Sequence, residues 1–474
     1  MDKRSLFDEL DEKVKPSDSA STDPAPLSSL SEANEAPDLD EASASPSPAQ
    51  QNNAPLSESP TPDVPPEADD FVPLSRSTNM AKSAPVSQSR HEKKRQKKLI
   101  EPTVEANAYT YRPQAHPERK KLHYGIEALR ILSMLFVVLL HVLGRGGVAA
   151  ATEAHSASYS AAWLLLSFAY PAVNLYALIS GYVGCKSTFR LSKLITLWIG
   201  LITVNLVVWG AFGVFSPEIA KTYSLSECLT PICSSEYWYV NAYIGLYLLT
   251  PVLNIAIEHL NKRRFQLVLG SMFVLFVLLP AISKHDLFLM HTGYSALWLI
   301  VMYLVGGYIR IHVHRPVRRS VAYTGLASYV LLSLFIFVQK LVVEQKLFVE
   351  QAENPYFYDN YSYTSPYIAL SAVGLFLFFV YLNPKKKKQR RLIRFFSQTA
   401  FGVYLFHTQP LIWESLITDR FAVFGQYATP AMVLACVAVS IGIFIACALL
   451  EKIRALIVRF SGVEYALKRI PFLN

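Results

Sequence analysis

Three ionisable side chains interrupt an apolar stretch that begins at Gly125 and ends at Gly144. They are Glu127, Arg130 and His141. On an α-helix, Arg130 and His141 project from one face about 16 Å apart along the axis, and Glu127 lies close to that stripe. An imidazole serves as a general base or a nucleophile, so the stripe predicts a catalytic site or a proton relay. The alternative is a Glu127–Arg130 ion pair beside a structural histidine.

A second polar group extends from residue 174 to residue 193. Asn174 and Tyr182 are polar positions in an otherwise apolar segment, and we expect them to line a cavity. Lys186, Arg190 and Lys193 then form a cluster of cations. Ammonium and guanidinium groups suit phosphate oxygens, so the cluster predicts a site for a phosphate-rich ligand. The alternative is that these cations only mark the cytoplasmic side of a membrane.

Three further candidates lie in later apolar segments. Tyr239 belongs to an aromatic group of the kind found at membrane interfaces, and Asn241 lies deeper in the membrane. We expect both residues to line a cavity. His407 is expected near mid-membrane and precedes Pro410, which breaks backbone hydrogen bonding. His407 is a weaker catalytic candidate than His141, because a hydrogen bond to a neighbouring helix would account for it.

The elements that must position these residues are membrane-spanning helices. The chain is 52% hydrophobic and only 17% charged, against about a quarter charged in soluble domains. Apolar runs near 20 residues long recur from residue 125 onward, and about 20 helical residues cross a bilayer. The sequence therefore predicts an all-α polytopic bundle of ten spans, at about 126–144, 160–182, 192–214, 237–257, 265–283, 294–311, 320–341, 364–382, 397–417 and 430–450.

Charge divides the chain into different parts. Residues 1–70 hold 17 acidic and 4 basic residues, whereas residues 71–474 hold 41 basic and 19 acidic ones. The sequence predicts a disordered cytoplasmic tail over 1–121, acidic and then basic, because its Pro- and Ser-rich composition buries little apolar surface. A membrane domain over 122–455 and a short cytoplasmic tail over 456–474 follow. The basic run at 90–98 is expected to lie against anionic lipids, and nothing indicates nucleic-acid binding.

Loop charge predicts the orientation of the bundle. With the N-terminus in the cytoplasm, the expected inner loops carry 17 basic residues and the expected outer loops carry 6, which follows the positive-inside rule. Ten spans return the C-terminus to the cytoplasm. Cys228 and Cys233 share an expected outer loop, either as a disulfide or as free thiols. The Cys and His spacings predict no metal site.

These motifs resemble the bacterial acyltransferase-3 family of integral membrane O-acyltransferases. The resemblance covers about 122–455. It rests on the first span, GIEALRILSMLFVVLLH, and on VNLYALISGYVGCKSTFRLSKL, which is similar to the family's Ser-Gly-Tyr segment and following basic motif. Two later landmarks, YWYVNAYIGLYLLTPVLN and FGVYLFHTQPLI, follow in the same order.

The resemblance implies transfer of an acyl group, usually acetyl, from cytoplasmic acyl-CoA to an extracytoplasmic carbohydrate at a bacterial cell membrane. It implies His141 as the catalytic residue with Arg130 as its essential partner, and Glu127 would hold Arg130. Acetyl-CoA is then a substrate, and no cofactor is expected to stay bound. The family's Arg-x-x-Arg motif is here Arg190-Leu-Ser-Lys193, which keeps the charge but loses one guanidinium fork.

Some points stay open at the level of sequence. Either the membrane domain acylates the glycan directly, or a separate extracytoplasmic transferase completes the transfer. A transporter or flippase for a lipid-linked glycan would also suit intramembrane charges and a Pro-broken helix, although no inverted repeat is visible. A glycan polymerase would need a larger outer loop than the chain offers.

Overall fold

The computed structural model describes residues 122–233, 236–283, 285–313, 316–344, 361–462 and 469–470. The expected tail over 1–121, with its basic run, lies outside these residues. Most of the segment between the spans expected at 320–341 and 364–382 also lies outside them, as do most residues beyond 462.

Every regular element in the described ranges is a helix, which confirms the all-α prediction. Between the long helices lie short ones, α4 (Val148–Ala151), α8 (Pro217–Ala220), α9 (Leu225–Leu229), α12 (Leu279–Ser283) and α18 (Pro410–Ile412). The longer helices are α3 (Tyr124–Leu143), α5 (Ala157–Ala169), α6 (Ala172–Gly184), α7 (Leu191–Phe215), α10 (Trp238–His259), α11 (Lys262–Phe273), α13 (Ala296–His312), α14 (Arg319–Glu344), α16 (Pro366–Tyr381), α17 (Lys387–His407) and α19 (Thr429–Phe460).

Seven helical segments among the described residues are long and apolar enough to span a membrane, and α13 and α16 are shorter apolar helices. The chain is therefore a multi-pass membrane protein. The expected number of ten spans is not confirmed by these segments, and one expected span is corrected. The span expected at 397–417 is not continuous, because α17 starts ten residues earlier and ends at His407. The short helix α18 then begins at Pro410, and the Gln409 side-chain oxygen accepts hydrogen bonds from its backbone N–H groups at Leu411 and Ile412.

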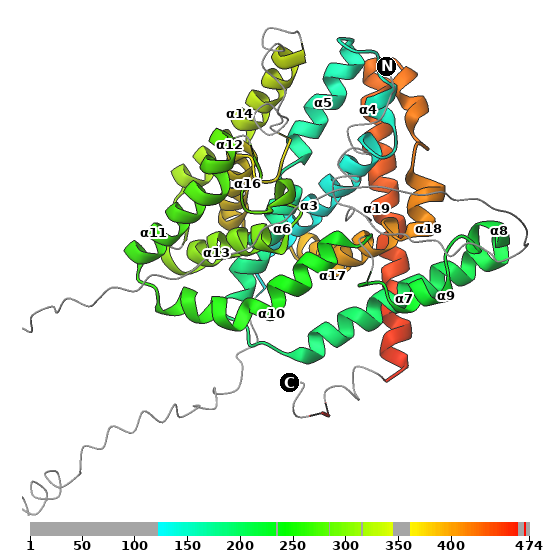
Figure 1. Ribbon diagram of the computed structural model, residues 1–474, viewed down its shortest axis with the longest axis horizontal. Coiled ribbons are helices and arrows are strands. Elements are labelled where there is room, and N and C mark those ends of the chain that lie inside the picture. Colours follow the sequence, from blue (N-terminus) through cyan, green and yellow to red (C-terminus); the bar gives the residue numbers. More distant parts are fainter. Residues whose placement is uncertain are drawn as a thin grey trace, which may run out of the picture. The chain divides into compact units, whose positions relative to one another are not determined.

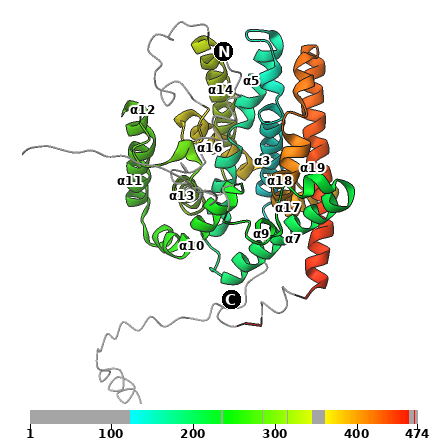
Figure 2. The same cartoon turned by 45° about the vertical axis from the view of Figure 1, so that its right-hand side comes forward.

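Helix α3 occupies the centre of the bundle and carries the polar stripe. It packs against α5, α6, α16, α17 and α19. Both views place α11 and α12 on one side of α3 and α19 on the other (Figures 1 and 2). Because neighbours surround α3, its buried polar residues face protein rather than lipid, as intramembrane polar groups require.

Small residues allow the closest helix contact in this region. A Cβ added at Gly181 of α6 would overlap the backbone carbonyl of Tyr303 on α13. One added at Gly306 of α13 would likewise overlap the carbonyl of Leu178. Glycines at both crossing points let the two backbones approach, which is a common means of packing helices in membranes. This contact sets the position of the α6 face that carries Tyr176.

Candidate active site

Two histidines from distant parts of the chain meet in the bundle. His141, near the end of α3, places Nδ1 2.9 Å from Nε2 of His407, the last residue of α17. His407 is fully buried, and its Nδ1 lies 2.6 Å from the carbonyl oxygen of Val403. The pair forms because α3 and α17 pack side by side.

When both rings are neutral, these contacts determine the tautomer of each. A carbonyl only accepts hydrogen bonds, so Nδ1 of His407 donates to Val403 and its Nε2 is the acceptor nitrogen of a neutral ring. Nδ1 of His141 must then donate to that acceptor. The remaining lone pair of His141 is on Nε2, which has no hydrogen-bond partner among the described residues. The arrangement thus presents one unpaired basic nitrogen.

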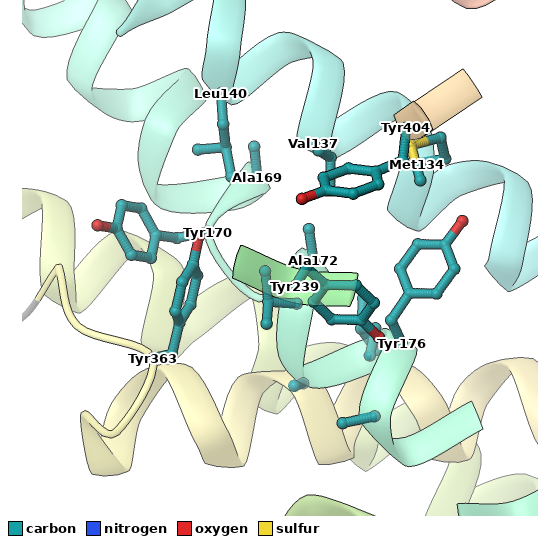
Figure 3. Close-up of a cluster of buried hydrophobic side chains, with 14 of the residues drawn as sticks. Met134, Val137, Leu140, Ala169, Tyr170, Ala172, Tyr176, Tyr239, Tyr363 and Tyr404 are labelled. Carbon is teal, nitrogen blue, oxygen red and sulfur yellow. The ribbon is translucent and has the colours of Figure 1, made fainter. Parts of the chain in front are cut away.

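A small cavity contains His141, and we call it the His chamber. Its volume is about 50 Å³. Its apolar wall includes Met134, Val137 and Leu140 of α3, and its other lining residues are His141, Val173, Tyr176, Trp238, Tyr239, Tyr294, Tyr363, Phe401 and Tyr404. Figure 3 shows part of this lining, with rings from α6, α10 and α17 around the α3 side chains. The polar groups of the lining are therefore phenols and an indole around one imidazole.

Trp413 also contacts His141. Its ring meets the imidazole edge-on, with centroids 4.8 Å apart. Trp413 follows the break after His407, so the same break that ends α17 also brings this indole to the site. Together, Trp413 and His407 hold the imidazole in one orientation.

A second and larger cavity adjoins the first, and we call it the vestibule. Its volume is about 310 Å³. Its polar lining includes Arg130, Lys193, Tyr243 and Tyr247, and the remaining lining residues are Tyr176, Ile179, Ser180, Leu194, Leu197, Tyr239 and Phe401. Three rings, those of Tyr176, Tyr239 and Phe401, line both cavities.

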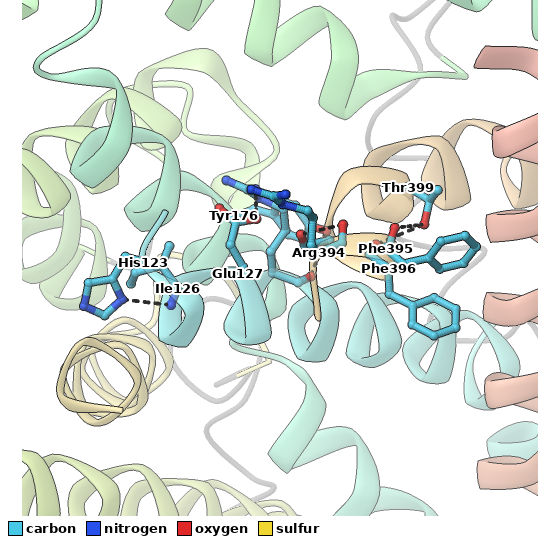
Figure 4. Close-up of polar contacts among 10 residues, drawn as sticks. His123, Ile126, Glu127, Tyr176, Arg394, Phe395, Phe396 and Thr399 are labelled. Carbon is cyan, nitrogen blue, oxygen red and sulfur yellow. Dashed lines mark hydrogen bonds and ion pairs between the residues drawn. The ribbon is translucent and has the colours of Figure 1, made fainter. Parts of the chain in front are cut away.

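Arg130 lies in the vestibule and not in the His chamber. Its Nη1 is 2.6 Å from Oε2 of Glu127, so the i,i+3 ion pair expected from the sequence is present. The Tyr176 hydroxyl donates to the backbone carbonyl of Arg130. Figure 4 shows Glu127, in the first turn of α3, beside Tyr176 of α6. His123 caps this end of α3. Arg130 and His141 thus share a helix face but line separate cavities.

The three expected cations differ in position. Lys193 lines the vestibule, and its Nζ lies 5.9 Å from the centre of the Tyr247 ring. Arg190 is exposed and does not line the vestibule, but its backbone is tied to it, since its N–H donates to the Tyr247 hydroxyl. Lys186 is exposed and lines neither cavity.

The other expected cavity residues also separate. Tyr239 lines both cavities, whereas Asn174, Tyr182 and Asn241 line neither. Asn174 is fully buried and connects three segments. Its amide nitrogen donates to the carbonyl of Tyr363, and its oxygen accepts from the indole of Trp298. Tyr182 packs instead under the guanidinium of Arg310, 5.1 Å from its ring centre.

Several site residues were not among the sequence candidates. Tyr247 follows Tyr239 by eight residues, a spacing that places both on one helix face. Tyr404 lies three residues before His407 and shares its face by the same rule. Those spacings could have indicated the lining. Tyr294 and Tyr363 come from loop segments, and no local pattern indicates them.

The two loop cysteines are free thiols. Cys228 is buried and Cys233 is exposed. Burial, together with the nearby Glu227 carboxylate, raises the pKa of the Cys228 thiol to about 11. A thiol of that pKa stays protonated near neutral pH and reacts slowly. No His, Cys, Asp or Glu group within the described ranges is arranged to hold a metal ion.

Residues 123–451 match the acyltransferase-3 family, which is described as an acyltransferase domain. The chain belongs to the acyltransferase-3 family. The match includes every residue of both cavities, and it confirms the family expected from the motifs. The chain matches no curated protein and no solved structure at a significant level. An acyltransferase domain built from apolar helices makes this protein a membrane acyltransferase.

Proposed function

We propose that this acyltransferase transfers an acetyl group from cytoplasmic acetyl-CoA to a hydroxyl of an extracytoplasmic carbohydrate. The observation that carries the proposal is the chain from the Val403 carbonyl through His407 to His141, which leaves Nε2 of His141 as an unpaired base in a cavity. An acyl transfer to a hydroxyl needs such a base.

The orientation follows from charge. Arg130 and Lys193 lie toward the ends of α3 and α7 that follow basic segments, so the positive-inside rule puts the vestibule on the cytoplasmic side. His141 is eleven residues along α3 from Arg130, or about 16 Å deeper. Both termini are then cytoplasmic. The protein itself is proposed to lie in the plasma membrane of a bacterial cell. The vestibule receives the donor, and the His chamber faces the acceptor.

Donor binding uses the cations of the vestibule. Acetyl-CoA carries several phosphate charges, and Lys193 and Arg130 supply donors suited to phosphate oxygens. Arg190 and Lys186 are exposed at the same end and add attraction at longer range. Glu127 holds the Arg130 guanidinium in place through its 2.6 Å contact. No cofactor remains bound between turnovers.

The transfer itself takes place at His141. Nε2 removes the proton from the acceptor hydroxyl as its oxygen forms a bond to the thioester carbonyl carbon. The carbon–sulfur bond then breaks, and the proton on Nε2 passes to the departing CoA thiolate. The phenol groups of the chamber donate hydrogen bonds to the developing oxyanion, a stabilisation that is usually a large part of catalysis. His407 keeps its Nδ1 proton and acts by orienting His141.

The acceptor meets aromatic groups on its way to His141. Trp238, Tyr294 and Tyr363 line the chamber and pack against one another, with the Trp238 and Tyr294 ring centres 4.4 Å apart. Ring faces of this kind suit the apolar faces of a sugar. Direct acylation of the glycan is therefore proposed, without a separate extracytoplasmic transferase.

The test is acyl transfer across sealed membrane vesicles. Acetyl-CoA labelled in the acetyl group is supplied on the cytoplasmic face, and label is measured on carbohydrate on the other face. His141→Ala should abolish labelling, whereas His259→Ala should not, because His259 is exposed and, among the described residues, its ring bonds to the carbonyl of Ile255 on its own helix. Equal labelling by His141→Ala at normal protein levels would refute the assignment. Label that remains on the protein after quenching would indicate a covalent acyl-histidine intermediate instead of general-base catalysis.

A further inference from the structure

Three aromatic rings lie between the vestibule, where the donor is proposed to bind, and the His chamber. Tyr176 of α6, Tyr239 of α10 and Phe401 of α17 line both cavities. Tyr176 and Tyr239 have their centres 6.2 Å apart, and the hydroxyl of Tyr176 is held by the Arg130 carbonyl. The rings therefore lie between the cationic vestibule and the imidazole.

The two compartments differ strongly in size. The vestibule has a volume of about 310 Å³ and the His chamber about 50 Å³. An acyl chain therefore finds much less room beside His141 than in the vestibule.

The walls of the His chamber cannot easily recede. Met134 and Val137 of α3 and Val173 of α6 are buried, with at most 8% of their surface exposed. The two helices pack directly against each other. Close-packed interiors resist added volume, because extra methylene groups force side chains off their rotamers and shift the backbone. Figure 3 shows Met134 and Val137 facing this space among the tyrosine rings.

We propose that the His chamber selects the length of the transferred acyl group, with Val137 and Val173 as the specificity-determining residues. The three shared rings admit the narrow thioester arm and keep the rest of the donor in the vestibule. When the thioester carbon reaches His141, the acyl chain must enter the chamber, so each methylene beyond acetyl is disfavoured. This proposal rests on the proposed function, because it requires an acyl-CoA donor at His141.

The experiment measures kcat/KM for acetyl-, propionyl-, butyryl- and hexanoyl-CoA with the full chain in vesicles. One methylene in an apolar pocket changes kcat/KM by about 10- to 200-fold, so the unmodified protein should discriminate against butyryl by at least tenfold. Val137→Ala and Val173→Ala should each raise the butyryl-to-acetyl ratio about tenfold or more. Val173→Leu should reduce propionyl transfer more than acetyl transfer.

Val142→Ala is the matched control. Val142 is on α3 and fully buried, but it lines neither cavity. It should leave the ratio unchanged, and a ratio within one variant is insensitive to how much of that variant folds. The proposal is overturned if the unmodified protein uses hexanoyl-CoA as well as acetyl-CoA. It is also overturned if Val137→Ala and Val173→Ala shift the ratio no more than the control.

Failure of the proposed function gives a different result. If no acyl-CoA labels carbohydrate, or if His141→Ala labels it as well as the unmodified protein, the assignment of the donor or of the base is wrong. The proposed selection of acyl length is then wrong as well. If acetyl transfer depends on His141 and the length ratios do not move, only the proposed selection of acyl length is wrong.

Discussion

Replacing His407 tests how His141 is made a base. In the structure, Nε2 of His407 accepts the Nδ1 proton of His141 at 2.9 Å. His407→Leu removes the acceptor while nearly conserving side-chain volume. The Nδ1–H of His141 is then left unpaired, or the ring changes tautomer and loses the lone pair on Nε2.

The magnitude follows from that single lost interaction. An unsatisfied buried donor costs about 1–3 kcal/mol, and each 1.36 kcal/mol corresponds to tenfold in rate. His407→Leu should therefore lower kcat by about 5- to 150-fold. It should leave the KM for acyl-CoA unchanged, because Arg130 and Lys193 are in the other cavity. His141→Ala removes the base itself and should cost about 10²–10⁴-fold.

Two further variants separate orientation from proton transfer and from packing. His407→Gln provides a non-titrating amide oxygen near the position of Nε2, so it should restore most of the activity that His407→Leu loses. A double variant, His141→Ala with His407→Leu, should be no slower than His141→Ala alone, since a positioning residue has nothing left to position.

The assay is the initial rate of labelled acetyl transfer in vesicles, normalised to folded protein. A normal kcat in His407→Leu would refute the hydrogen-bonded chain. A His407→Gln variant as slow as His141→Ala would show that His407 exchanges a proton during turnover. Additive losses in the double variant would indicate a purely structural role.

Three other predictions concern the donor site and the bundle. Lys193→Ala should raise the KM for acyl-CoA about tenfold, through loss of a charge-assisted contact, whereas Lys186→Ala, outside the vestibule, should change it less than about twofold; equal effects would contradict the placement of the donor. Gly181→Ala should lower the melting temperature in detergent, because a Cβ there overlaps the Tyr303 carbonyl, at a cost of about 1–3 kcal/mol; an unchanged midpoint would mean that the helices separate freely. Asn174→Ala should destabilise the fold by about 1–3 kcal/mol, because an indole N–H and a backbone carbonyl lose their partner; a raised donor KM with normal stability would instead make it a binding residue.

The class of structure was predictable because hydrophobicity is a local property of the chain. Apolar runs near 20 residues long specify helices that cross a bilayer, and every regular element described is a helix. The helical period also placed Glu127 within reach of Arg130, and the ion pair that was weighed as the alternative to a catalytic stripe is present. The span predicted at 397–417 was wrong at both ends. The first half of α17 is amphipathic and basic, so it does not read as an apolar run, and the helix starts earlier, at Lys387. It ends at His407, just before Gln409 and Pro410 begin the next helix.

The sequence by itself determined the membrane bundle, the polar stripe on its first helix and the resemblance to a family. All three depend on residue type and spacing along one element. Only the tertiary structure decided that His407 is the partner of His141, that Arg130 and His141 occupy different cavities, and that Asn174 connects segments rather than lining a site. The physical reason is that these facts depend on which faces of α3, α6, α10 and α17 pack together, and helix period alone does not determine that packing.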